Sequence, residues 1–393
     1  MRFLSTVAIS FAFFLLGASV GCVHRTEVEK PQVRLRAVSQ NPTGGWADFV
    51  IVEEGDLLFT SLIGPGADVA GSTLEEQVDE VLKKVAEKLA EVGSDLRNLV
   101  RLHVYVADEK RIVEVETILR EALPTGANPA LVSIGSALPW PEAAVAIDAV
   151  AAVPQGIVAP DGPDSRAAIL PRGPAAFISG RAAPGGLSTA TVETLRQLDA
   201  DLERIGLHWR DVVQMKVFLQ PIRSMETVRE IAGEFLPPDA RPALVFAEWV
   251  ETPHPLEIEL IASAASAQDS PEGEFIKYYD SNGKFSRIVR ANSGDFIFTG
   301  LLRGDPQTSV ATQVKQQFSM LERLLETAGS DRSHLLKATY YVVDPAAEGS
   351  YNAVRPDVFS IDRAPAASRA HVRAVGSHGE SSALDLIAIR VEQ

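Results

Sequence analysis

Three stretches of the chain share the amphipathic pattern of long helices, with hydrophobic residues recurring every three or four positions. The first runs from Leu74 to Val92, the second from Val192 to Ile205 and the third from Val310 to Ala328. The first begins at Ser72-Thr73-Leu74-Glu75, which is a candidate capping box. The pattern therefore predicts three long helices of similar length, well separated along the chain.

The residues after each helical stretch keep the same spacing in all three cases. Each stretch is followed by a glycine suited to a left-handed helix cap: Gly93, Gly206 and Gly329. Seven positions on, an alternating strand-like run opens at Val100, Val213 and Leu336. Twelve positions on stands an aromatic residue: Tyr105, Phe218 and Tyr341. Thirty-six positions on, a Pro-Ala pair begins at Pro129, Pro242 and Pro365. Agreement at this many positions indicates a threefold internal repeat.

Within each repeat the pattern predicts strands, a long helix, a strand, a second helical stretch and a terminal hairpin. The second helical stretches are expected at Glu114–Ala122, Met225–Phe235 and Tyr351–Phe359. The closing strands are expected at Ala144–Val150, Leu256–Ile261 and Ala383–Ala388. We name the repeats copy 1 (46–153), copy 2 (166–266) and copy 3 (274–393), and Pro/Gly/Asp/Ser-rich linkers separate them. The expected fold class is α+β.

The N-terminus reads as a targeting segment, which is kept apart from the fold. Residues 1–22 contain Arg2, an apolar stretch and then small residues before Cys22, the single cysteine of the chain. This order resembles a bacterial lipobox, with Ser19 where leucine is usual. We expect an exported lipoprotein held at the membrane of the cell envelope through Cys22, with residues 23–45 as a tether. The alternatives are ordinary signal cleavage near Gly21 and an uncleaved anchor.

Composition and charge exclude several function classes. The formal net charge of −15 opposes a sequence-independent nucleic-acid binder, because neutralising phosphates needs an excess of Lys and Arg. A single cysteine excludes a disulfide framework and a cysteine-cluster zinc site. The seven histidines lack metal-ligand spacing, and His103 is expected to be packed or solvated within a strand. We therefore expect no metal, no cofactor and no nucleic-acid partner.

The motifs resemble those of the RidA family, also called YjgF or L-PSP. The matching features of copy 1 are Gly-Asp-Leu-Leu-Phe59-Thr, the helix ending in Gly93-Ser94-Asp-Leu, the Val-Tyr-Val strand, the Pro-Ala pair and a closing strand of alternating apolar and acidic residues. The resemblance implies a chorismate-mutase-like fold. Family members are typically homotrimers with a ligand cleft at each subunit interface. Three covalently joined copies are then expected to form an intrachain pseudo-trimer, monomeric as a chain, with small-molecule clefts between copies.

The resemblance also implies where imine chemistry would occur. Family enzymes hydrolyse enamines and imines of 2-keto acids, with an arginine just after Pro-Ala that grips the substrate carboxylate. That position holds Leu131, Leu244 and Ala367 here. Arg369 lies two residues beyond Ala367, on the same strand face, and is a candidate displaced clamp. The alternative is that Arg369 is a solvated cation at a strand end.

A glutamate on the closing strand is the second group that the resemblance implies, as a residue that positions or activates water. Only copy 2 retains it, at Glu257, whereas Ala146 and Ala383 stand in the other copies. An acid two residues further persists in every copy: Asp148, Glu259 and Asp385. We interpret this second acid as structural, in an interstrand or intercopy ion pair.

These observations favour a RidA-like small-molecule-binding protein with divergent clefts and without standard imine deaminase activity. The expected ligand-binding positions are Leu131, Leu244, Ala367, Tyr105, Phe218 and Tyr341. One alternative is an enamine/imine deaminase, a hydrolase acting on C=N bonds with Glu257 and Arg369 as catalytic residues. Another is a scaffold module of the cell envelope. The acidic net charge gives no support to a nuclease.

Overall fold

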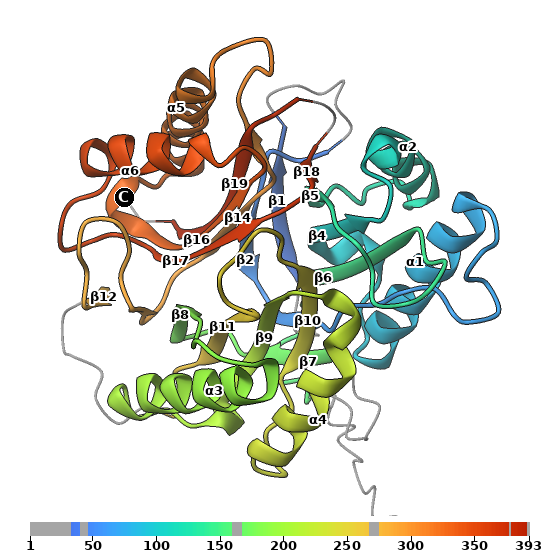
Figure 1. The fold of residues 1–393 in the computed structure, drawn as a ribbon, viewed down its shortest axis with the longest axis horizontal. Coiled ribbons are helices and arrows are strands. Elements are labelled where there is room, and N and C mark those ends of the chain that lie inside the picture. Colours follow the sequence, from blue (N-terminus) through green and yellow to red (C-terminus); the bar gives the residue numbers. More distant parts are fainter. Residues whose placement is uncertain (1–32, 40–45, 159–166, 267–274, 377–378, 391–393) are drawn as a thin grey trace, which may run out of the picture. The chain divides into compact units, whose positions relative to one another are not determined.

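The computed structural model describes residues 33–39, 46–158, 167–266, 275–376 and 379–390 (Figure 1). The signal peptide expected at 1–22, lipidation at Cys22 and tether residues 23–32 and 40–45 lie outside these ranges and stay predictions. Within the described ranges, no helix combines the length and hydropathy that a membrane crossing needs.

The three copies share one succession of elements, to which copy 3 adds short strands. Copy 1 comprises β2 (Phe49–Glu54), β3 (Asp56–Thr60), α1 (Leu74–Glu91), β4 (Leu99–Val106), α2 (Ile112–Ala122), β5 (Ala130–Gly135) and β6 (Val145–Val153). Copy 2 comprises β7 (Ala167–Leu170), β8 (Ala175–Arg181), α3 (Leu187–Arg204), β9 (Val212–Leu219), α4 (Met225–Phe235), β10 (Ala243–Glu248) and β11 (Leu256–Ser263). Copy 3 comprises β12 (Ile276–Tyr279), β13 (Ile288–Ala291), β14 (Phe296–Thr299), β15 (Leu302–Arg303), α5 (Val310–Ala328), β16 (Leu335–Val342), α6 (Ala346–Val358), β17 (Ala366–His371), β18 (Ala374–Val375) and β19 (Ser382–Ile389). The predicted α+β class and the threefold repeat are confirmed.

The ends of the long helices show why these sequences stop and start where they do. Thr73 is the N-cap of α1 and forms a capping box with Glu76, so the box lies one residue later than the predicted Ser72–Glu75 pair. The predicted C-terminal glycines are confirmed: Gly93, Gly206 and Gly329 have φ angles of 70°, 71° and 75°. Only glycine adopts this left-handed conformation without strain.

In each sheet the strand that follows the long helix lies inside the sheet, with a strand paired on either side. The orders are β18-β5-β4-β6-β3-β7, β10-β9-β11-β8-β13-β12 and β1-β2-β14-β19-β16-β17, where β1 is Arg34–Val38. The predicted terminal hairpin is wrong, because β4 lies between β5 and β6 and pairs with both, parallel to β5 and antiparallel to β6. The same insertion occurs in the other two sheets. The connection between the two last strands therefore crosses over a strand, which alternation of residues alone does not reveal.

Strands are exchanged between copies, so each sheet contains strands of more than one copy. β7 of copy 2 pairs with β3 of copy 1, β13 of copy 3 pairs with β8 of copy 2, and β2 of copy 1 pairs with β14 of copy 3. A single glycine, Gly55, separates β2 from β3, with φ +119°. One residue cannot form the two-residue loop of a tight hairpin, so the chain turns from one sheet into the next. The exchange closes into a cycle of three sheets.

Part of the expected tether is structured. Arg34–Val38 forms β1, which pairs antiparallel with β2 at the edge of the copy 3 sheet. Arg34 also forms ion pairs with Glu53 and Glu54 across the two strands. The sequence pattern did not predict this strand, because it is only five residues long and two of them are arginines.

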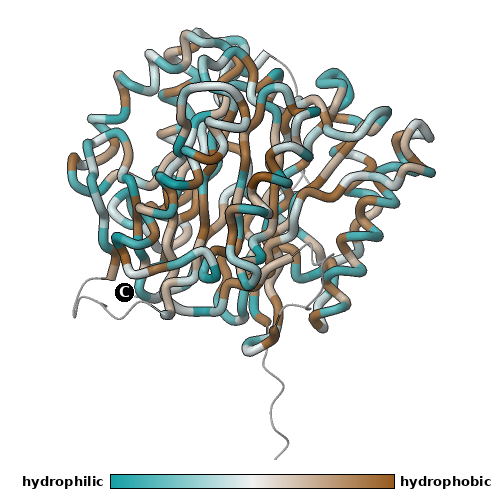
Figure 2. Tube along the Cα trace, turned by 60° about the horizontal axis from the view of Figure 1, so that its bottom comes forward, coloured by the Kyte–Doolittle hydropathy of each residue, from teal (hydrophilic) through white to brown (hydrophobic). Residues whose placement is uncertain are grey.

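Two kinds of hydrophobic core result from this arrangement. The helix pairs α1–α2, α3–α4 and α5–α6 cover the outward faces of the sheets (Figure 1) and pack on three helix–sheet cores. The inward faces of all three sheets meet in a fourth core that includes Phe59, Phe177 and Phe298. Figure 2 accordingly shows hydrophobic colour concentrated in the middle of the molecule, whereas the outer helices and loops alternate between hydrophobic and hydrophilic colour. The inward-facing strand residues of each copy thus pack against those of the other copies, as expected for a pseudo-trimer.

Candidate functional site

The residue two positions after each repeated proline lies at a junction between two copies. The amide of Leu244 donates to Ser61 Oγ at 2.9 Å, which joins copy 2 to copy 1. The amide of Ala367 donates to Ser179 Oγ at 2.7 Å, which joins copy 3 to copy 2. The carbonyl of Leu131 accepts from the Leu301 amide at 2.9 Å, which joins copy 1 to copy 3. These contacts define a 1–2 junction, a 2–3 junction and a 3–1 junction.

The 2–3 junction brings together the two residues that the sequence selected as catalytic candidates. Glu257 on β11 accepts hydrogen bonds from the Ser368 hydroxyl and the Arg369 backbone amide, both on β17. Its other oxygen, Oε1, is buried without a hydrogen-bond partner. A Cβ on Gly180 would lie 2.1 Å from Oε1, so only glycine leaves room for the carboxyl there. The carboxyl of Glu257 is thus held at the boundary of two copies.

The protonation of Glu257 is shifted toward neutrality. Burial is the main cause that raises its pKa to about 7, and the negative charge of Glu259 adds to the effect. The hydrogen bonds from Ser368 and the Arg369 amide oppose the shift. A carboxyl with a pKa near neutrality can accept or donate a proton in general acid–base catalysis.

The guanidinium of Arg369 pairs with a different carboxylate from the one that its backbone amide contacts. Arg369 is in register with Tyr340 on β16, which faces the α5–α6 side of the sheet. There its Nη1 pairs with Glu348 of α6, and its Nε is buried without a partner. Ala367 faces the same side, as the sequence predicted, but the guanidinium is already neutralised by a carboxylate. Its role as a displaced substrate clamp stays a prediction.

The 3–1 junction contains a cavity of about 220 Å³. Its wall combines apolar side chains, among them Trp46, Leu131, Leu301 and Met320, with the charged side chains of Asp48, Glu116 and Arg303. Ser133 also lines the cavity, and its buried Oγ has no hydrogen-bond partner. Leu131, which stands at the family's arginine position, therefore faces a small cavity with one unsatisfied hydroxyl.

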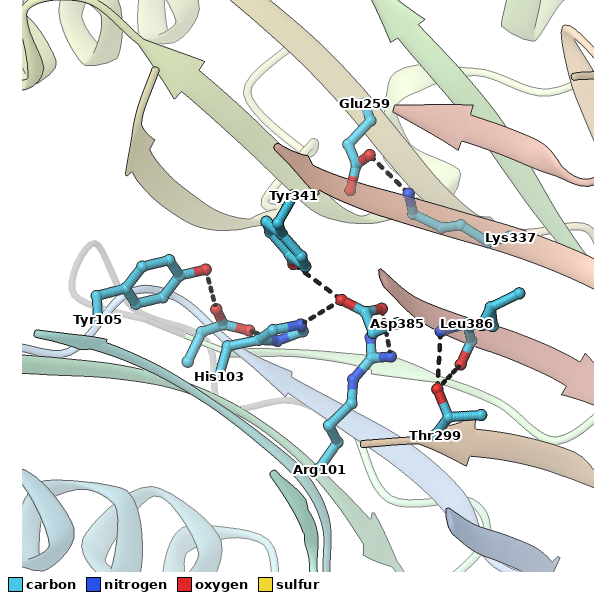
Figure 3. A network of polar contacts seen from close by, with 10 residues as sticks. Arg101, His103, Tyr105, Glu259, Thr299, Lys337, Tyr341, Asp385 and Leu386 are labelled. Atoms are coloured by element: carbon cyan, nitrogen blue, oxygen red, sulfur yellow. Dashed lines mark hydrogen bonds and ion pairs between the residues drawn. The ribbon is translucent and has the colours of Figure 1, made fainter. Parts of the chain in front are cut away.

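The three aromatic candidates lie deeper, and Figure 3 shows two of them, Tyr105 and Tyr341, in a polar network. Tyr105, Phe218 and Tyr341 are each fully buried. The hydroxyl of Tyr105 donates to Asp148 at 2.8 Å, and that of Tyr341 donates to Asp385 at 2.8 Å. Their side chains hold the carboxylates of the closing strands, and a ligand-binding role for the three rings stays a prediction.

Ion pairs in this network cross the boundaries between copies. Arg101 of copy 1 lies 2.9 Å from Asp385 of copy 3, and Lys337 of copy 3 lies 2.6 Å from Glu259 of copy 2. Figure 3 shows His103 between two carboxylates, with Nδ1 3.1 Å from Asp148 and Nε2 3.4 Å from Asp385. The interpretation of the persistent acid as an intercopy ion-pair residue is confirmed for Glu259 and Asp385.

Lys216 completes the network from copy 2. Its ammonium lies 5.7 Å from the ring centroids of both Tyr105 and Phe218. Burial lowers the pKa of Lys216, whereas the charges of Asp148, Glu259 and Asp385 counteract that shift. Arg101 and His103 hold the pKa of Asp385 below its usual range despite burial, which acts in the opposite direction. Because carboxylates of all three copies act on Lys216, the closing acids share one electrostatic environment.

The described residues contain no group of three or more histidine, cysteine or acidic side chains arranged to hold a metal ion.

Comparison with known families identifies the repeated unit. The model of the Endoribonuclease L-PSP family matches residues 39–153, 167–264 and 276–381. The chain belongs to the L-PSP family, in three tandem copies. The match includes the closing strands of copies 1 and 2 and ends just before β19 in copy 3.

Solved structures similar to single copies include members of the same family under its YjgF name. A YjgF-family protein from Neisseria meningitidis is 21% identical, with 30% of this chain and 97% of that chain covered and a TM-score of 0.24. A member of the YjgF/YER057c/UK114 family from Mycobacterium tuberculosis is 24% identical, with 30% and 100% covered and a TM-score of 0.22. A putative endoribonuclease from Thermotoga maritima is 19% identical, with 26% and 84% covered and a TM-score of 0.23. Among curated proteins none matches significantly.

Sequence reasoning missed several residues that build the junctions. Ser61 and Ser179 each stand two positions after the repeated strand phenylalanine, which is Phe59 or Phe177. Each hydroxyl accepts a hydrogen bond from a backbone amide of the neighbouring copy. This repeat-level signal was available in the sequence. Gly300 replaces the serine in copy 3, and Ser368 of that copy holds Glu257. Ser368 carries no such signal, because Val132 and Val245 occupy its position in the other copies.

Proposed function

We propose that this L-PSP protein binds small molecules at junctions between its copies and lacks the standard imine deaminase activity of family enzymes. The observation that carries the proposal is the apolar residue at the family's arginine position in each copy: Leu131, Leu244 and Ala367. Without a guanidinium there, the carboxylate of a small keto-acid imine loses two charge-assisted hydrogen bonds. The substitute that the sequence suggests on the same strand, Arg369, is paired with Glu348.

The 3–1 junction supports a binding role for a small, largely apolar molecule. Trp46, Leu131 and Met320 offer apolar contact, and the unsatisfied Ser133 hydroxyl offers one hydrogen bond. Ligand sites commonly combine an apolar wall with a few polar groups that fix orientation. A cavity of about 220 Å³ suits a molecule of roughly one aromatic ring with a polar substituent.

Benzyl alcohol is a suitable probe for the 3–1 cavity, with saturation-transfer NMR as the measurement. We expect binding by the wild-type protein and a loss of about tenfold in affinity for Leu131→Arg, which fills the cavity with a charged side chain. Ile361→Arg is the matched control, because Ile361 is 74% exposed. Equal binding by wild type and Leu131→Arg would contradict a binding role for this cavity.

The absence of standard activity is tested separately with 2-iminopropanoate, whose hydrolysis is followed by competition with semicarbazide. We expect no rate above background for the wild-type chain. A clear rate would overturn this part of the proposal and support the second candidate below.

The second candidate is an imine deaminase confined to the 2–3 junction. The observation favouring it is the Glu257 carboxyl, which has a pKa of about 7 and a buried Oε1 without a partner. Such a group can pass a proton to or from a water or an imine nitrogen. If 2-iminopropanoate is hydrolysed, Glu257→Gln should abolish the rate, whereas Glu230→Gln on the exposed face of α4 should retain it.

A further inference from the structure

Copy 2 has a cavity of about 390 Å³ on its helix pair, which we call the α3–α4 cavity. The two helices lie side by side on the outward face of the copy 2 sheet (Figure 1). The cavity is lined by Asp199 of α3, the turn His208-Trp209-Arg210 after α3, Phe235 at the end of α4, and Pro237 and Asp239 beyond it. Every lining residue belongs to copy 2, so the α3–α4 cavity is separate from the three junctions between copies.

Two aromatic rings form the apolar part of the wall. The ring of Trp209 is almost fully buried and meets the half-buried ring of Phe235 edge to face, with 6.0 Å between the ring centroids. Leu96 and Arg332 stand at the position of Trp209 in the other copies, three residues after the helix-ending glycine. The repeated fold therefore does not require an aromatic residue at this position.

The charges around the α3–α4 cavity favour a cation. Within the described part of the chain, the carboxylates of Asp199 and Asp239 have neither an ion pair nor a hydrogen bond. Arg210 and His208 also line the cavity, but both are exposed, and only the arginine has a permanent charge. Helix α4 ends here without a basic residue in its last turn, and the C-terminal end of a helix carries a partial negative charge.

Copy 3 has a cation of its own at the equivalent place. Glu322 of α5 stands at the repeat position of Asp199, seven residues before the helix-ending glycine, and Arg332 stands at the position of Trp209. The Nη1 of Arg332 lies 3.2 Å from Glu322 Oε1 and donates to the carbonyl of Asp357, near the end of α6, at 3.2 Å. In copy 3 a guanidinium thus joins the acid of the long helix to the end of the second helix. In copy 2 the arginine is replaced by tryptophan, and Asp199 is left without a cation.

We propose that the α3–α4 cavity binds a small organic cation whose guanidinium group takes the place that Arg332 holds in copy 3. The guanidinium pairs with Asp199 near the C-terminal end of α4, and the apolar body of the ligand packs on Trp209 and Phe235. A guanidinium suits this wall because it is planar, binds a carboxylate with two N–H groups and stacks on aromatic rings. The inference goes beyond the proposed function, since the site lies within one copy and takes a cation.

Benzylguanidinium and benzylurea are matched probes for this proposal, because they share shape and differ in charge. Binding of each to the full chain is measured by isothermal titration calorimetry at pH 7 and constant ionic strength. We expect the wild type to prefer benzylguanidinium by about fivefold or more, the range of one partly exposed ion pair together with a cation–π contact. Asp199→Asn should remove most of this preference while the affinity for benzylurea changes little. Asp239→Asn should remove a smaller part, because Asp239 is exposed.

Glu203→Gln is the control for a general loss of negative charge, because Glu203 is exposed on α3, one turn after Asp199, and does not line the cavity. It should keep the preference for benzylguanidinium. The proposal is overturned if the wild type binds neither probe or binds both equally, if Asp199→Asn keeps the preference, or if Glu203→Gln loses it. None of these results bears on binding at the junctions, which the benzyl alcohol experiment tests separately. Thermal unfolding of each variant shows that it is folded before binding is measured.

Discussion

The ammonium of Lys337 lies 2.6 Å from Glu259 Oε2, and both side chains are buried where the three sheets meet. The two residues are 78 positions apart in the sequence and belong to copies 3 and 2. Arg101 and Asp385 form the corresponding contact between copies 1 and 3. The interior of the molecule is therefore joined by charge as well as by hydrophobic packing.

Breaking one of these pairs should be costly. Arg101→Met leaves the buried carboxylate of Asp385 without its closest cation, and removing one partner of a buried pair typically costs about 3–5 kcal/mol. We expect a loss of about that size in the free energy of unfolding, measured by urea denaturation at pH 7. Arg97→Met is the matched control, since Arg97 pairs with Asp95 on the surface, and it should have no measurable effect. Equal stability of the two variants would contradict this role of the network.

The pH dependence of stability should depend on Glu257. Its pKa is raised to about 7 in the folded protein, so between about pH 4.5 and 7 the folded state binds more protons than the unfolded state. Stability contributed by this group therefore falls as the pH rises through that window. Glu257→Gln removes the effect, and its stability relative to wild type should increase from pH 5 to pH 8, by at most about 3 kcal/mol. A difference that is constant with pH would show that Glu257 ionises normally.

Gly180 should tolerate no side chain. Gly180→Ala would place a Cβ 2.1 Å from Glu257 Oε1 and should lower the free energy of unfolding by about 1–3 kcal/mol. Gly233→Ala in α4 is the control, because no atom lies near its Cβ position, and it should gain about 0.5–1 kcal/mol. Adding Glu257→Ala should relieve the defect of Gly180→Ala. Additive effects in this double-mutant cycle would contradict the contact.

The three copies should unfold together. Each sheet contains strands from more than one copy, so no copy can lose its strands without opening a neighbouring sheet. The four tryptophans lie in copies 1 and 2 (Trp46, Trp140, Trp209 and Trp249), whereas circular dichroism reports on all three copies. Urea unfolding curves from tryptophan fluorescence and far-UV circular dichroism should coincide. A second transition seen only by circular dichroism would indicate that copy 3 unfolds independently.

Most helices and central strands followed from the sequence because their hydrophobic periodicity depends on burial of one face, which the local sequence records. Strand partners did not follow, since alternation gives a strand its faces and not its neighbour. The exchange of β2, β7 and β13 and the insertion of β4 between β5 and β6 are of this kind. Helix α6 also begins at Ala346, five residues before the predicted start, because its first turn is rich in small residues without an apolar stripe.

The candidate site was predictable to a similar extent. The meeting of Glu257 and Arg369 at one junction agrees with the idea that a cleft could combine residues of two copies. The pairing of the Arg369 guanidinium with Glu348 could not be foreseen, because Glu348 lies in the part of α6 that the sequence pattern missed.

The pairing of β2 with β14 has a consequence for synthesis of the chain. The first copy's leading strand reaches its partner only after roughly 240 further residues have been made. At about 5–20 residues per second, that interval is on the order of 12–50 s. During this time the edge of β2 is unpaired, and an unpaired strand edge is a template for association with other chains. Folding of this protein therefore requires that β2 does not associate with another chain before β14 has been made. A chaperone that binds the nascent chain would prevent such association.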